Sequence, residues 1–392
     1  MATVTRLAVN PDVLRWARTT ADVDVATAAT RVGVKPNRIT QWESGEVQPT
    51  INQLRSMSVA YQRPLAALLM TQPLVDEERP HVPDFRRPET REAASPAALQ
   101  RAIMRAHRQR DALREIAQEL GWPEEATFAD LEFPDGVGAE RAGETLRASL
   151  RMDTIARGTV SRPTEHLREL VRRAEDLRIT VIQVQRVEVS TMRGFSLGDG
   201  SFPIVALNGA DWPRGKIFSL LHELAHVGFR SSGLCDLEQL DDSALERRCE
   251  QVAATALMPA RAFRSALGTL RGNELTVEAA RAVGNEFGAS GEAAVLRMIE
   301  LERADWDDYW RLKPSFEEAY RQFKREEKSR GEGKDAPIFY QLKARDLGRR
   351  FVRQVLEAYG DDAISSRDLV QLLEVSYDKI PKLAGTLGDV AV

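Results

Sequence analysis

The stretch "FSLLHELAHVGF" at residues 218–229 constrains the fold most, because it places two histidines and a glutamate in an apolar helical segment. His222, Glu223 and His226 follow the spacing H-E-x-x-H, and side chains four residues apart lie on one face of a helix. Buried polar side chains need partners. The two histidines are therefore either hydrogen-bonded inside a core helix or bound to a metal ion, and the glutamate between them favours the metal.

The metal that this pattern favours is zinc, Zn2+. Catalytic zinc sites have three protein ligands and one open position, and the ion lowers the pKa of a bound water towards about 7. Glu223 can reach that water and take its proton. The third ligand must lie downstream, and we favour Glu246, 20 residues after His226 on a predicted helix at 243–258. The other candidates are Cys235, Asp236, Glu238, Asp241, Asp242 and Glu250.

Two of these candidates have a second interpretation. Glu250 lies one helical turn after Glu246 and shares its face, so it either replaces Glu246 as a ligand or orients a ligand histidine. Cys235 is either a thiolate close to the zinc, which would block the open position until displaced, or an ordinary buried thiol.

Residues 190–260 resemble the ImmA/IrrE-type metallopeptidase family. The resemblance rests on "RGFSLGDGSFPIVALN", "IFSLLHELAHVGF" and "LERRCEQVAATALMPA". These match a strand ending in Asn, the H-E-x-x-H helix, and a helix with Glu and Ala-Ala leading to Leu-x-Pro. The resemblance implies an α+β, zincin-like domain. Related proteins cleave repressors of mobile elements or of stress genes.

The same resemblance implies a set of site residues. His222, His226 and Glu246 correspond to the family's zinc ligands, and Glu223 corresponds to its catalytic glutamate. This sequence departs from the family twice: it has Ser219 where Thr is frequent, and Glu250 where Asn is usual.

Two segments rich in β-branched residues predict a small sheet, "ITVIQVQRVEV" at 179–189 and "FPIVALN" at 202–208. The second strand allows two interpretations. As an edge strand it would hold a substrate by backbone hydrogen bonds, as edge strands do in zinc peptidases, and otherwise it is an ordinary core strand.

Residues 23–69 resemble a Cro/repressor-type (XRE) helix-turn-helix domain. Small residues suit the close crossing of two helices, a glycine suits the turn, and Ile and Trp anchor the reading helix on the core. The residues that match this pattern are Ala28, Ala29, Gly33, Ile39, Trp42, Glu43 and Gly45.

The exposed side chains of the reading helix are then predicted to be Lys35, Asn37, Arg38 and Gln41. Asn, Gln and Arg read base edges in the major groove, and Lys suits phosphates. Residues 1–70 hold eight Lys/Arg and five Asp/Glu, so we expect weak binding by a monomer and a homodimer on a palindromic operator in double-stranded DNA. The alternative is a helical protein-interaction domain.

Length and composition predict a multidomain, mainly α protein with a small β-sheet. The 392 residues exceed one ordinary domain, and two cysteines rule out a disulfide framework. No apolar leader or membrane-length run is present, so we expect a cytoplasmic protein without a membrane partner. The net charge of −4 restricts any DNA-binding surface to a local one.

The expected domains are an all-α helix-turn-helix at 1–71, a Pro-rich linker at 72–92, the metallopeptidase at 93–300 and a helical C-terminal region at 301–392. A long helix should begin at Ser95 and end near Gly121, and 324–337 should be a mobile loop. The C-terminal region should hold one long amphipathic helix and two short ones. It acts either as a cap or dimerisation element, or as a sensor of a ligand or partner.

These features predict a DNA-binding transcriptional regulator with a zinc-dependent endopeptidase domain. It would cleave a regulatory protein, a partner repressor or itself, in response to a signal. The alternative is a non-proteolytic repressor or antitoxin that uses the peptidase-like domain as a sensor or to bind a partner such as a toxin. A purely structural zinc fits less well, because such a site needs a fourth protein ligand.

Overall fold

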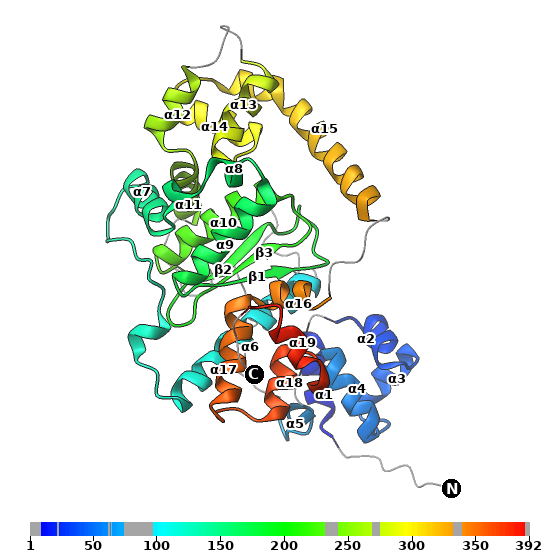
Figure 1. Cartoon of the computed structure of the whole chain (residues 1–392). Coiled ribbons are helices and arrows are strands. Elements are labelled where there is room, and N and C mark those ends of the chain that lie inside the picture. The colour runs from blue at the N-terminus through cyan, green and yellow to red at the C-terminus, as the bar shows by residue number, and fades with distance from the viewer. Residues whose placement is uncertain are drawn as a thin grey trace. The chain divides into compact units, whose positions relative to one another are not determined.

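The computed structural model describes residues 9–21, 23–61, 63, 65–73, 97–231, 242–268, 275–331 and 339–388. Most of its elements are helices, and three strands form one sheet (Figure 1). This confirms the predicted fold class. The chain divides into two compact units, Met1–His81 with Arg87–Arg105, and Val82–Arg86 with Ala106–Val392. The division at Arg105 falls inside a long helix, α6 (Ala97–Glu119), and the predicted cap Ser95 lies outside the described residues.

The first unit contains a bundle of short helices around its own core. The helices are α1 (Pro11–Thr20), α2 (Val25–Val32), α3 (Pro36–Glu43), α4 (Ile51–Tyr61) and α5 (Leu65–Leu68). Ala28, Ile39 and Trp42 are buried in that core, as predicted. Gly33 ends α2 in the left-handed conformation with φ of 78°, which a residue without Cβ adopts at low cost. The chain therefore turns directly from α2 into α3.

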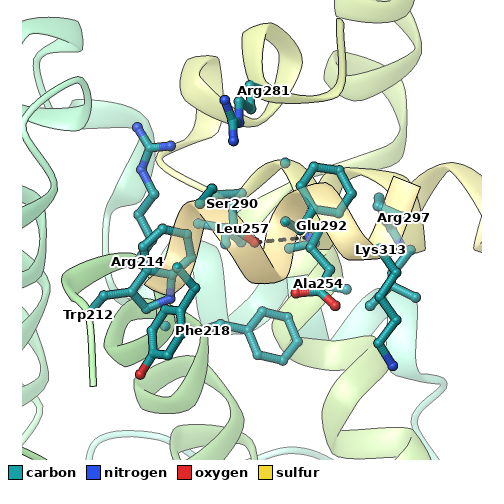
Figure 2. Close-up of a pocket in the computed structure, with 18 of the residues that line it drawn as sticks. Trp212, Arg214, Phe218, Ala254, Leu257, Arg281, Ser290, Glu292, Arg297 and Lys313 are labelled. Atoms are coloured by element: carbon teal, nitrogen blue, oxygen red, sulfur yellow. Dashed lines mark hydrogen bonds between the residues drawn. The ribbon is translucent and has the colours of Figure 1, made fainter. Parts of the chain in front are cut away.

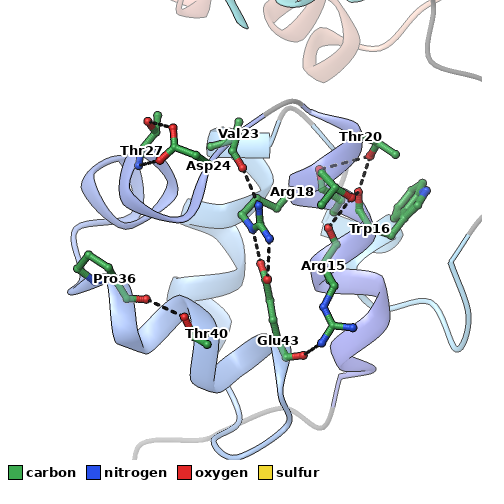
Figure 3. Close-up of polar contacts among 12 residues, drawn as sticks. Arg15, Trp16, Arg18, Thr20, Val23, Asp24, Thr27, Pro36, Thr40 and Glu43 are labelled. Atoms are coloured by element: carbon green, nitrogen blue, oxygen red, sulfur yellow. Dashed lines mark hydrogen bonds and ion pairs between the residues drawn. The ribbon is translucent and has the colours of Figure 1, made fainter. Parts of the chain in front are cut away.

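An ion pair fixes α1 against the end of α3 (Figure 3). Glu43 is only 6% exposed, and Arg18 donates to both of its carboxylate oxygens, at 2.6 and 2.9 Å. Arg15 donates to the carbonyl of Glu43 at 2.5 Å. Two residues later, a Cβ on Gly45 would lie 3.1 Å from Pro11. The Glu-x-Gly pattern is thus explained by contacts with α1.

The sheet of the second unit has β3 (Ile204–Asn208) at its centre. It pairs in parallel with β1 (Thr180–Val184) and antiparallel with β2 (Gly194–Leu197). The strand predicted at 202–208 is therefore a core strand, and its interpretation as the edge strand was wrong. β2 takes that edge position among the described strands, and its four residues were too short to predict.

Helix α10 (Pro213–Gly228) packs on the sheet and is buried along most of its length. It contacts α9 (Pro163–Asp176) and α11 (Asp242–Leu257), and α11 packs on α7 (Ala139–Ser149). Leu220, Leu221 and Leu224 of α10 are fully buried in the common core. The remaining elements of this region are η1 (Glu124–Thr127), η2 (Met152–Thr154), α8 (Arg157–Val160), α12 (Ala260–Leu267), α13 (Val277–Phe287) and α14 (Gly291–Glu300).

Helix α15 (Trp306–Gly331) extends beyond its predicted end. The prediction of a mobile loop at 324–337 was wrong for residues 324–331, which continue the helix, and residues 332–338 lie outside the described residues. The physical reason is the sequence "KREEKSR", because Lys, Arg and Glu have high helix propensity.

The C-terminal helices form a second core against β1, within the same unit. They are α16 (Phe339–Leu347), α17 (Arg349–Gly360), α18 (Ser366–Leu373), η3 (Tyr377–Lys379) and α19 (Ile380–Ala384). The prediction of one long helix was wrong, because the chain breaks at Gly348. This glycine has φ of 87°, and a Cβ there would lie 2.7 Å from Cγ2 of Thr180. No helix among the described residues is long and apolar enough to span a membrane.

Gly348→Ala should destabilise the protein, because alanine has an unfavourable φ there and would clash with Thr180. We expect a loss of about 1–3 kcal/mol in the free energy of unfolding, measured by urea denaturation. Gly360→Ala is the control, since a Cβ added at Gly360 would meet nothing within 4 Å beyond its own helix and its φ is not positive. Equal stability of the two variants would contradict this account of the break.

Candidate metal centre and DNA-reading surface

Three predicted ligand side chains converge between α10 and α11. The Nε2 atoms of His222 and His226 lie 3.2 Å apart. The carboxylate of Glu246 lies 3.2 Å from Nε2 of His222 and 2.9 Å from Nε2 of His226. All three residues are buried, and their ligand atoms lie within 4.8 Å of one another. One ion at the centre of this group would contact all three.

The donor set fits a divalent cation such as zinc. Ligands about 2.0–2.2 Å from a tetrahedral zinc lie about 3.3–3.6 Å apart, a few tenths of an ångström more than the observed separations. The chemistry of the imidazoles points the same way. Two neutral imidazoles that both donate Nε2–H to Glu246 would leave two N–H groups facing each other at 3.2 Å, whereas a cation at the centre would accept a lone pair from all three side chains. The site can therefore hold a metal ion.

The charges around His226 and Glu246 show that a metal ion would have to displace a proton from this site. Burial lowers the pKa of His226, but interactions with Cys249 and Glu246 outweigh it, so the net pKa is well above the ordinary value. Burial raises the pKa of Glu246, but hydrogen bonds from His222 and His226 outweigh it and hold the pKa at about 2. Burial also raises the pKa of the Cys249 thiol. Without a cation, a proton on His226 therefore compensates the charge of Glu246.

Glu223 is held against the edge strand β2. Its side chain is buried, and Oγ of Ser196 donates to Oε2 at 3.0 Å. A Cβ on Gly194 would lie 2.9 Å from Oε1, so the glycine leaves room for the carboxylate. Sequence reasoning missed Ser196 because it did not predict β2.

Two further neighbours of His226 were also missed. Oγ of Ser231 lies 3.2 Å from Nδ1 of His226, and buried Cys249 interacts with the same imidazole. Cys249 could have been predicted from the sequence, because it follows Glu246 by three residues and residues three apart share a helix face. Glu250 does not join the cluster: it is exposed and lines a neighbouring cavity. Outside the described residues lie Cys235, Asp236, Glu238 and Asp241, as well as the side chain of Asp242.

The predicted reading helix is α3, and its outer face is polar. Lys35 and Asn37 are exposed, whereas Arg38 and Gln41 are partly exposed. Gln41 donates to Oε1 of Glu46 at 3.1 Å, a contact that a base would have to replace. Thr40 is also exposed on this helix and was not predicted (Figure 3). The face thus offers both donors and acceptors.

Comparison with known families supports both domains. Residues 174–298 match a peptidase family described as the IrrE N-terminal-like domain, and this match contains α10, α11 and the three clustered residues. Residues 14–68 match the helix-turn-helix family, from α1 to α5. No curated protein and no solved structure matches the chain.

Zinc binding should release protons near neutral pH, and zinc affinity should fall as the pH falls. The raised pKa keeps His226 protonated above its ordinary range, so the metal must displace that proton. Calorimetry in buffers of different ionisation enthalpy measures the release. His226→Gln should weaken zinc binding at least about 100-fold, whereas the control His107→Gln, outside the cluster, should not. Affinity that does not change with pH would contradict this account.

Proposed function

Because the chain carries an XRE-type helix-turn-helix domain at residues 14–68 and an IrrE-like peptidase domain at 174–298, we propose that it is a transcriptional regulator with a zinc-dependent endopeptidase. Its substrate is a regulatory protein, either a partner repressor or another copy of this chain, and cleavage follows a signal in the cytoplasm. The observation that carries this proposal is the convergence of His222, His226 and Glu246 beside Glu223.

His222, His226 and Glu246 hold the zinc in this proposal. Bound there, the ion supplies Lewis-acid activation of a water molecule and of the scissile carbonyl. Side chains of the protein carry out the proton transfers. Glu223 is the general base that takes a proton from the attacking water and then gives it to the leaving amine. Ser196 positions Glu223 by its hydrogen bond to Oε2 at 3.0 Å.

The substrate peptide binds along the free edge of strand β2 in this proposal. β2 pairs on one side with β3, and no described strand pairs with its other side. Its Ser196 and Gly194 contact Glu223, so the free edge lies beside the reacting group. An extended peptide added to this edge gains backbone hydrogen bonds and lies beside β2, close to Glu223.

The helix-turn-helix domain directs the protein to DNA. The exposed polar face of α3 enters the major groove, where Asn37, Arg38 and Gln41 contact bases and Lys35 contacts a phosphate. Two copies on a palindromic site supply the affinity that the modest local charge of one copy does not.

Glu223→Gln should keep zinc and lose cleavage. Removal of a general base costs about 10²–10⁴-fold in rate, and the amide retains the shape of the side chain. The test incubates zinc-loaded wild type and variant with candidate partner repressors, and with the chain itself, and identifies products by mass spectrometry. Glu278→Gln, at an exposed position on α13, is the control and should cleave as wild type does. If wild type binds zinc and never cleaves under inducing conditions, the protein is a non-proteolytic repressor or antitoxin.

Arg38→Ala should weaken operator binding about tenfold or more, because the truncated side chain loses a base or phosphate contact. A gel shift with DNA from the promoter of the chain's own gene measures this. Arg55→Ala removes the same charge from an exposed position on α4 and should change binding little. If wild type shifts no DNA, or if both variants bind equally, α3 is not the reading helix.

A further inference from the structure

A cavity of about 1380 Å³ is lined in part by α10 and α11, the helices that carry the metal-site residues (Figure 2). Residues of α10, α11, α13, α14 and α15 line it, and it is open to solvent on one side. Ser219 in its wall precedes Glu223 by one turn of α10, and Glu250 follows Glu246 by one turn of α11. The cavity therefore continues the two helix faces that carry the candidate metal ligands.

The spacing along α10 shows how close the cavity is to the reacting group. Ser219, His222, Glu223 and His226 have the spacing i, i+3, i+4 and i+7, which places them on one helix face. One helical turn advances about 5.4 Å, and an extended peptide advances about 3.3 Å per residue. A peptide cleaved at Glu223 thus brings the side chain of the next one or two residues to the cavity.

The start of edge strand β2 also lies at the cavity. Arg193 lines the cavity and directly precedes Gly194, the first residue of β2. A peptide that pairs with the free edge of β2 is therefore guided along Glu223 and into the cavity. Because its walls belong to the metal-bearing helices and to the start of β2, the cavity suits a substrate side chain better than a separate small ligand.

The lining of the cavity has an excess of positive charge. Its cationic side chains are Arg193, Arg214, Arg247, Arg281, Arg297, Lys313 and Arg321, against the carboxylates of Glu250, Glu292, Glu300 and Glu317. Two of the four carboxylates have partners. Glu300 pairs with Arg297 at 2.6 Å, and Glu292 accepts from the hydroxyl of Tyr309 at 3.0 Å. The seven cationic side chains exceed the four carboxylates by three, so the lining keeps a net positive charge.

Arg214 and Arg281 are two cations of this lining whose charges act on each other. Arg214 lies in the first turn of α10 and Arg281 on α13, and no ion pair joins either to a described carboxylate. Burial, followed by the charge of Arg281, lowers the pKa of Arg214. Figure 2 shows both side chains at one end of the cavity, away from Lys313. An anion between them would relieve the repulsion and gain charge-assisted hydrogen bonds.

Aromatic side chains line the cavity beside this cationic end. Trp212, at the start of α10, packs edge-on against Tyr320 and Phe323 of α15, with ring centres 5.8 and 6.0 Å apart. Phe218 lies next to Trp212 in Figure 2. The site therefore combines apolar walls, which bury the stem of a side chain, with guanidinium groups that hold its charged end.

We propose that this cavity is the specificity pocket of the peptidase and takes an acidic side chain of the substrate beside the scissile bond. Arg214 and Arg281 hold its carboxylate, or the phosphate of a phosphoserine. This inference rests on the proposed function, since it assigns the substrate class of that site.

The test separates binding from cleavage. Zinc-loaded Glu223→Gln protein is used to select binders from a random peptide library, and the bound peptides are sequenced. Asp, Glu or phosphoserine should be enriched at one position. Adding Arg214→Ala and Arg281→Ala should reduce this enrichment about tenfold. The matched control adds Arg261→Ala and Arg264→Ala, which remove the same charge from exposed positions on α12, and should keep the enrichment.

Arg281→Glu alone provides the second variant, because Arg281 is exposed and its replacement leaves the core intact. It should shift the preference from acidic to basic residues. No acidic enrichment with the parent protein, or the same enrichment in the Arg214/Arg281 and control variants, would overturn the proposal. Saturable binding of citrate or ADP that needs both arginines and that acidic peptides do not displace would also overturn it, in favour of a free anionic ligand.

Cleavage of the same library by zinc-loaded wild type distinguishes the two proposals. Acidic binders without any cleavage would support the pocket and reject the peptidase. Cleavage with no preference for acidic residues would support the peptidase and reject the pocket.

Discussion

Three buried polar side chains, His222, His226 and Glu246, face one another inside an apolar core, and burying them is costly unless each has a partner. The fold of the second unit is arranged around this constraint. α10 supplies the histidines on one face, α11 supplies the glutamate, and the packing of both helices holds the donors about 3 Å apart. β2 then places Ser196 on Glu223. The proposed chemistry depends on this packing.

In the function that we propose, the same two helix faces connect catalysis with recognition. One turn beyond the metal-site residues, α10 and α11 line the cationic cavity, which we propose holds a side chain of the substrate. In the helix-turn-helix unit, a buried polar interaction also fixes the orientation of a helix. The buried pair of Arg18 and Glu43 ties α1 to the end of α3 and thereby sets the direction in which α3 presents its polar face.

The sequence predicted the features whose residues are close together and chemically distinctive. His222, Glu223 and His226 form a local pattern with one helical interpretation, and the turn at Gly33 with buried Ile39 and Trp42 is another. It did not predict β2, whose four residues form a strand only by pairing with β3. It also missed the break at Gly348, because the conflict with Thr180 joins positions 168 residues apart. Ser196 and the cavity depend on such long-range contacts, which no local pattern contains.

The identity of the atoms around the metal tests the central claim most directly. X-ray absorption spectroscopy on the zinc-loaded full chain measures the element and the distance of each ligand. Coordination by His222, His226 and Glu246 predicts nitrogen and oxygen at about 2.0–2.2 Å and no sulfur. A sulfur atom at about 2.3 Å would identify a cysteine as a ligand and contradict the assignment, as would a protein that binds no zinc at all.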